Sequence, residues 1–190
     1  MNIDKKNQIQ LIDKANLEKY FQVSKLRYSE LNDVEITLIF RNQIFFTIFA
    51  LLNLKSIFKK KRKYLVIVNL KKYAILSKLS EEHLTGWFGH ELAHIVDYEK
   101  MSQLQLLLFA IRYIFDLRFR FKVEKRINTY AVNNGFALEL FRVWKIFLRM
   151  ETVNIKYKRY IIENYCPNWE DIKEAAQSCG INKQLFESLK

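Results

Sequence analysis

Hydrophobic and polar residues follow two different periods in the first half of the chain. Between Asp4 and about Phe21, apolar side chains recur every three or four residues, which predicts an amphipathic helix. From Val34 to Phe40 they recur at every second residue, as in a half-buried strand. The β-branched run from Tyr64 to Asn69 predicts a well-buried strand, and residues 44 to 49 fit a strand or a helix equally. The pattern therefore predicts a helix followed by a small sheet.

The second half of the chain has helical spacing almost throughout. Helices are expected at about 81–99, 103–115, 118–133 and 137–150, with two more near 155–164 and 169–178. Four glycines and one proline in 190 residues argue against a turn-rich all-β protein. We predict an α+β fold, in which a small mixed sheet lies over the 81–99 helix and the C-terminal half is predominantly helical.

The sequence His90-Glu91-Leu92-Ala93-His94 is an H-E-x-x-H motif in the middle of the 81–99 helix. Ser80 reads as the N-cap of this helix, with two glutamates in its first turn. Histidines four apart lie on one helical face, so both rings can reach one zinc ion, while Glu91 lies beside the coordination position that they leave open. The motif predicts a zinc ion that activates water.

A zinc site of this kind needs a third protein ligand. The remaining histidine, His83, lies about two turns before His90 and is expected to be a solvated residue of the first turn. The carboxylates downstream are Glu99, Asp116, Glu124 and Glu139. Glu124 shares a helical face with Asn128, but lysine and arginine follow it directly, as for an ordinary solvated glutamate. Spacing alone leaves the third ligand open.

The motif at 90–94, followed by the helix with Glu124-x-x-Ile127-Asn128 and by a Gly-Phe turn, resembles the gluzincin metallopeptidases. It is most similar to the integral-membrane CAAX-prenyl-protease and heat-shock-protease group and to the small soluble minigluzincins, over residues 60 to 136. The repressor-cleaving metallopeptidases of the ImmA/IrrE type also carry such a glutamate helix, but their usual helix-turn-helix partner domain is not evident here.

The resemblance implies one zinc ion per chain, held by His90, His94 and Glu124. Asn128 stands where these families have an aspartate that supports a zinc histidine; its amide oxygen still accepts a hydrogen bond but carries no charge. The resemblance further implies a single zincin-like domain over 1–190. We divide it into an N-terminal helix and sheet (1–80), metal-site helices (81–136) and C-terminal helices (137–190).

The expected activity is that of a zinc metalloendopeptidase acting on a peptide or protein substrate, with Glu91 as general base. Tyr98 and Tyr130 are candidates for stabilising the oxyanion, and Asp97 for supporting a zinc histidine. The alternative is a catalytically silent zinc-binding domain with a regulatory or partner-binding role. A basic surface module with an accidental H-E-x-x-H motif is a third interpretation.

In such enzymes one strand borders the substrate cleft, and the strand at 64–69, just before the metal helix, is the candidate for that border. Gly86 and Gly89 lie three residues apart on the metal helix. Their missing side chains either let a strand or the substrate approach closely or serve helix packing.

Charge and hydropathy bear on the protein's surroundings. The chain has 32 Lys and Arg against 20 Asp and Glu, including the run from Lys59 to Lys63, which predicts a solvated loop or a weak peripheral contact with an anionic membrane. No specific nucleic-acid motif accompanies it. The apolar runs 44–54 and 104–115 are too short to span a bilayer. Cys166 and Cys179 have no metal-site spacing and the N-terminus has no signal-peptide pattern, so we expect a cytoplasmic protein.

Overall fold

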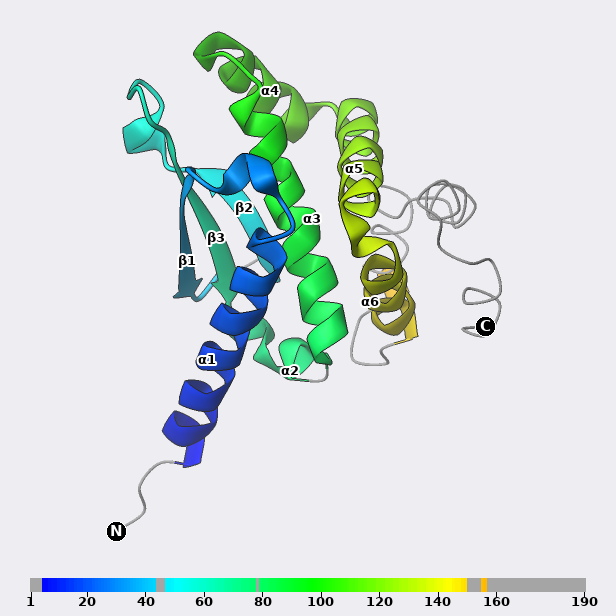
Figure 1. The fold of residues 1–190 in the computed structure, drawn as a ribbon. Coiled ribbons are helices and arrows are strands. Elements are labelled where there is room, and N and C mark those ends of the chain that lie inside the picture. Colours follow the sequence, from blue (N-terminus) through cyan, green and yellow to red (C-terminus); the bar gives the residue numbers. More distant parts are fainter. Residues whose placement is uncertain (1–4, 44–46, 78, 150–154, 157–190) are drawn as a thin grey trace.

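A computed structural model of the chain describes residues 5–43, 47–77, 79–149 and 155–156. The fold is α+β, as predicted, with a small mixed sheet and a predominantly helical second half. Helix α3 (Glu81–Glu99) runs through the middle, with the sheet and α1 (Lys5–Lys25) on one side and α5 (Leu117–Ala131) and α6 (Ala137–Arg149) on the other (Figure 1). The helix that bears the motif is therefore the central element.

The sheet contains β1 (Glu35–Arg41), β2 (Ile48–Leu52) and β3 (Lys63–Asn69) in the order β1-β3-β2. Strand β3 pairs parallel with β1 and antiparallel with β2. The prediction that the 64–69 strand borders the cleft is wrong, because β3 is the middle strand and β2 is the edge strand in contact with α3. The β-branched run of β3 reflects its burial between two neighbours.

The other helices agree with the sequence pattern. Helix α4 (Gln103–Phe115) crosses the end of α3, and a π-helical turn (Val132–Phe136), kinked at Asn134 and at Gly135 with its φ of 84°, joins α5 to α6. Short elements that were not predicted are α2 (Tyr73–Leu76) and the 3-10 turns Ser29–Leu31, Leu54–Ser56 and Leu70–Lys72. The helices expected at 155–164 and 169–178 fall almost wholly outside the described residues. Within the part that is described, no helix is long and apolar enough to cross a membrane.

The two glycines of α3 allow the second helical layer to approach it closely. A Cβ atom on Gly86 would lie 2.6 Å from the backbone carbonyl carbon of Glu139, and one on Gly89 would lie 2.5 Å from the ring of Phe136. Of the two alternatives for these glycines, helix packing is therefore the one that the structure supports. The approach matters for the site, because α6 and the π-helical turn hold α3 in place beside α5.

We predict that Gly86→Ala lowers the free energy of unfolding by about 1–3 kcal/mol, the usual range for overpacking. The reason is that the new methyl group meets backbone atoms of α6, which cannot rotate away. Chemical denaturation followed by circular dichroism measures the change. Glu81→Ala, at an exposed position of the same helix, is the matched control and should stay within about 1 kcal/mol of wild type. Equal stability of wild type and Gly86→Ala would show that α6 does not press against α3 here.

Candidate metal centre

The N-terminus of α3 is fixed as the sequence predicts. Ser80 caps the helix, and the imidazole Nδ1 of His83 accepts a hydrogen bond from the Ser80 backbone N–H at 3.0 Å. His83 is thus a residue of the first turn and takes no part in the metal centre. His90 and His94, four residues apart on this helix, face the same side.

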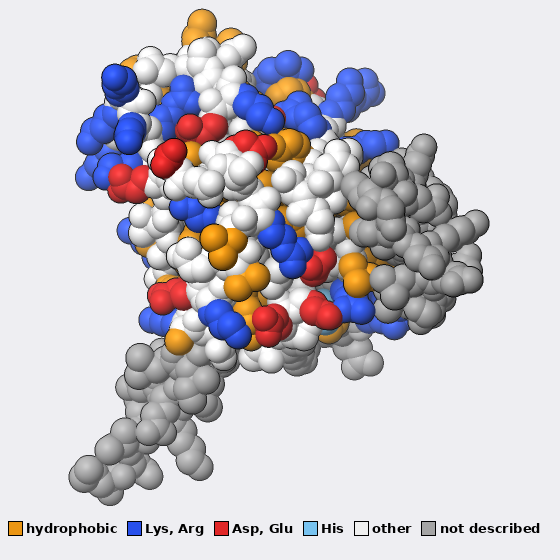
Figure 2. All heavy atoms as spheres, in the orientation of Figure 1, with side chains coloured by type: hydrophobic (Ala, Val, Ile, Leu, Met, Phe, Trp, Pro, Cys, Tyr) orange, Lys and Arg blue, Asp and Glu red, His pale blue; other side chains and the backbone are white. Residues whose placement is uncertain are grey.

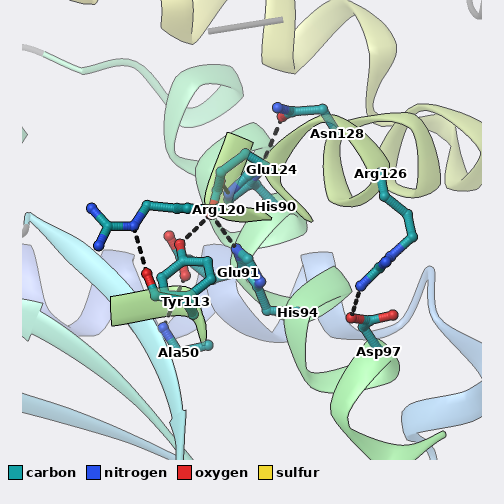
Figure 3. Close-up of polar contacts among 10 residues, drawn as sticks. All are labelled: Ala50, His90, Glu91, His94, Asp97, Tyr113, Arg120, Glu124, Arg126 and Asn128. Atoms are coloured by element: carbon teal, nitrogen blue, oxygen red, sulfur yellow. Dashed lines mark hydrogen bonds and ion pairs between the residues drawn. The ribbon is translucent and has the colours of Figure 1, made fainter. Parts of the chain in front are cut away.

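The two histidines of the motif and Glu124 meet in the interior. His90, His94 and Glu124 are 8%, 5% and 2% exposed, and their potential ligand atoms all lie within 4.8 Å of one another. One carboxylate oxygen of Glu124 lies 3.2 Å from His90 Nε2, and the other lies 3.5 Å from His94 Nε2 (Figure 3). Two nitrogens and a carboxylate in this arrangement could hold a metal ion.

Helix α5 brings Glu124 into this position. The Asp116 carboxylate caps the helix by accepting the Phe119 N–H at 2.9 Å. Val123, Ile127 and Ala131 then bury one face of α5 against the core, and Glu124 lies on that face. The cations that follow it are exposed, so the charged neighbours in sequence point away from the site.

The other carboxylates that the sequence left open have different partners. Glu139 forms an ion pair with Arg27 at 2.8 Å, Glu99 accepts a hydrogen bond from the Tyr64 hydroxyl, and Asp116 serves as the cap of α5. Among the described residues, His90, His94 and Glu124 form the one group of three potential ligands.

Asn128 occupies the supporting position that the resemblance implied. Its Oδ1 lies 3.0 Å from His90 Nδ1. When the ring N–H of His90 donates to this oxygen, the lone pair of His90 Nε2 faces Glu124 and is free for a cation. Asp97, the other predicted supporting residue, instead forms an ion pair with Arg126 at 2.6 Å. No hydrogen-bond partner from the described part of the chain reaches the buried His94 Nδ1.

Burial and neighbouring charges have opposite effects on the pKa values of Glu124 and His90. Burial raises the pKa of Glu124, but the imidazoles of His94 and His90 outweigh it and hold the pKa of that carboxyl well below its usual range. Burial lowers the pKa of His90, yet the hydrogen bond and charge of Glu124, with Glu91 adding to them, raise it to about 9. An anionic carboxylate in the interior thus calls for a positive charge beside it. A bound divalent cation fits that requirement and the donor set.

Glu91 lies next to this group, and β2 holds its carboxylate. Its Oε2 accepts the backbone N–H of Ala50 at 2.9 Å (Figure 3). Burial raises the pKa of Glu91. The general-base role of Glu91 stays a prediction. The strand that orients this side chain was not predicted, because the segment before Ala50 fits a strand and a helix equally well.

Tyr113 on α4 is the residue of the site that the sequence analysis missed. Its hydroxyl donates a hydrogen bond to Glu124, and its ring lies edge-on to His94 with centroids 6.4 Å apart. The two predicted oxyanion candidates lie differently: the Tyr98 ring stacks on His94 at 5.9 Å, and the Tyr130 hydroxyl bonds the Glu30 carboxylate. The available signal was helical spacing, since Tyr113 follows the buried Leu106 and Phe109 on one face of α4.

We compared the chain with known protein families, curated proteins and solved structures. No family model, curated protein or solved structure matches the chain. The resemblance to gluzincins therefore depends on the residue pattern alone and stays a prediction, whereas the structure shows a buried group that could hold a metal ion.

We predict that the purified chain binds about one zinc ion and that Glu124→Ala weakens binding by about 100-fold or more, because loss of even an outer hydrogen-bond partner commonly costs 10- to 100-fold. Competition with a chromophoric chelator measures the affinity. Glu139→Ala, which removes a carboxylate paired with Arg27, should leave it unchanged. If Glu124→Ala retains zinc under a chelator challenge that strips His94→Ala, then Glu124 is not a ligand.

Proposed function

We propose that the chain is a zinc-dependent metallopeptidase that hydrolyses peptide bonds with Glu91 as general base. The observation that carries the proposal is a fourth buried, titratable side chain, Glu91, beside the group of His90, His94 and Glu124. A site that only stabilises a fold closes its fourth position with a ligand, and it has no use for a neighbouring carboxylate that does not bind the metal.

Zinc held by His90, His94 and Glu124 would lower the pKa of a water molecule to about 7 and polarise the scissile carbonyl. Glu91 accepts the proton of the attacking water and donates it to the leaving amine nitrogen. Its raised pKa suits both roles, because a general base that must later act as an acid works best near the operating pH. The hydrogen bond from Ala50 leaves Oε1 of the carboxylate to carry the proton.

The outer edge of β2 is the place where we propose that the substrate binds. The N–H and C=O of one residue in a strand point to the same side. The Ala50 N–H points to Glu91 and away from β3, so the Ala50 carbonyl also faces the outer edge. A peptide added along this edge through main-chain hydrogen bonds would pass directly by Glu91.

Glu91→Gln should abolish hydrolysis while zinc stays bound. The amide matches the carboxylate in size and still accepts the Ala50 N–H, but it cannot take the water proton, so the rate constant should fall by about 10²- to 10⁴-fold. The assay follows fragments of an unfolded protein by mass spectrometry, with metal content measured in parallel. Wild-type fragments should disappear with a zinc chelator. Identical, chelator-insensitive results for wild type and Glu91→Gln would instead favour a silent zinc-binding domain.

Tyr113→Phe tests whether the Tyr113 hydroxyl stabilises the oxyanion of the tetrahedral intermediate. Removal of such a donor should lower kcat of the zinc-loaded enzyme by about 10²- to 10³-fold with little change in KM. Because the same hydroxyl donates to Glu124, zinc affinity is measured in parallel and kcat is compared at full zinc occupancy. Tyr98→Phe, which keeps the ring stacked on His94, is the matched control and should retain kcat. Weaker zinc binding by Tyr113→Phe, with a normal kcat for the loaded enzyme, would mean that the hydroxyl only positions Glu124.

A further inference from the structure

Helix α4 presents a long apolar face to solvent. Its outward residues are large and aliphatic or aromatic, from 48% to 82% exposed, and they recur at helical spacing: Leu104, Leu107, Leu108, Ile111, Ile114 and Phe115. Only Leu106 and Phe109 of this helix are buried. An exposed apolar stripe of this length is uncommon on a protein that works free in water and indicates a surface that another phase or molecule covers.

The apolar surface continues beyond α4. Leu117 and Phe121 at the start of α5 are 54% and 38% exposed. The connection between β2 and β3 carries two further exposed apolar side chains, Leu54 at 77% and Phe58 at 83%. This connection and α4 lie at the same end of the molecule (Figure 1). Two segments about 50 residues apart in the sequence thus expose apolar side chains at one end of the fold.

Cations border this apolar end. Lys59, Lys60 and Lys61 follow Phe58 directly and are exposed, and Arg118 and Lys122 are exposed on α5. Lys and Arg side chains gather on both sides of this end, with hydrophobic side chains between them (Figure 2). The acidic Asp116 is paired with Arg112 at 3.7 Å and so offsets little of this charge.

We propose that α4 and the β2–β3 connection together dock on the surface of an anionic lipid bilayer. Charge complementarity favours this occupant, because a cationic border around aliphatic and aromatic side chains matches anionic headgroups over acyl chains. Helix α4 has 13 residues, about 20 Å at 1.5 Å per residue, so it can lie in the interface but cannot cross a hydrocarbon core of about 30 Å. Phe58 and Leu54 add a second point of insertion beside the lysines.

Docking on this face would bring the metal centre close to the membrane. Tyr113 lies on the inward side of α4 and contacts Glu124, so the apolar face and the centre are separated by about one helix diameter, roughly 10–12 Å. Combined with the proposed peptidase activity, on which this step rests, the arrangement selects protein segments at the membrane surface as substrates. The docking itself does not depend on catalysis.

The test is co-sedimentation of the full chain with vesicles of phosphatidylcholine mixed with phosphatidylserine, compared with phosphatidylcholine alone. We expect salt-sensitive binding to the anionic vesicles only. The double variant Ile111→Asp/Phe115→Asp and the triple variant Lys59→Glu/Lys60→Glu/Lys61→Glu should each weaken it by about 10-fold or more. Leu26→Asp, at a position 79% exposed outside this face, is the matched control and should bind like wild type.

Every substituted side chain is solvent-exposed, so we expect each variant to fold like the wild type. Thermal unfolding of each variant checks this. Failure of the wild type to bind, equal binding to neutral vesicles, or wild-type binding by Ile111→Asp/Phe115→Asp would overturn the proposal. A wild type that binds no vesicles but self-associates would also overturn it if Ile111→Asp/Phe115→Asp abolishes the self-association. The apolar face would then be covered by a second copy of the chain. Loss of peptidase activity in a chain that still binds vesicles would count only against the proposed function.

Discussion

The buried carboxylate of Glu124 between two imidazoles is the strongest electrostatic constraint among the buried side chains of the site. A carboxylate that is 2% exposed is stable only beside positive charge, and His90 and His94 provide the nitrogens that share a proton or a metal ion with it. The surrounding elements meet this requirement. Gly86 and Gly89 let α6 and the π-helical turn press against α3, and the apolar face of α5 formed by Val123, Ile127 and Ala131 buries Glu124 with it.

Four elements contribute side chains or backbone groups to the centre. Helix α3 supplies the two histidines and Glu91, α5 supplies Glu124 and Asn128, β2 orients Glu91 through Ala50, and α4 places the Tyr113 hydroxyl on Glu124. The edge position of β2 matters, because an edge strand has main-chain groups facing outward where a peptide can add. Helix α4 has a second role, since its opposite side forms the apolar surface at one end of the molecule.

Local patterns in the sequence predicted most of the helices and strands. They did not predict the contacts between segments that are distant in the sequence. The spacing of apolar residues located α3, α4, α5 and α6, and the H-E-x-x-H motif located three of the buried polar residues, because one helical turn fixes their mutual geometry. The prediction that the 64–69 strand borders the cleft was wrong. Burial of the β3 run is equally consistent with a strand beside the cleft and one in the middle of the sheet, and only pairing with β1 and β2 decides between them. Tyr113 was missed for the same reason, since nothing local indicates that α4 folds back over His94. Asp97 was predicted to support a zinc histidine, but its partner is the guanidinium of Arg126 on α5.

Zinc K-edge X-ray absorption spectroscopy of the loaded protein measures directly which atoms hold the metal. If His90, His94 and Glu124 are the ligands, we expect a first shell of nitrogen and oxygen atoms only, at about 2.0–2.2 Å, with outer scattering from two imidazole rings that falls by about half in His94→Ala. A sulfur atom at about 2.3 Å would contradict it, because that distance marks a cysteine ligand. So would an imidazole signal unchanged by His94→Ala, since the metal would then lie away from the buried group of His90, His94 and Glu124.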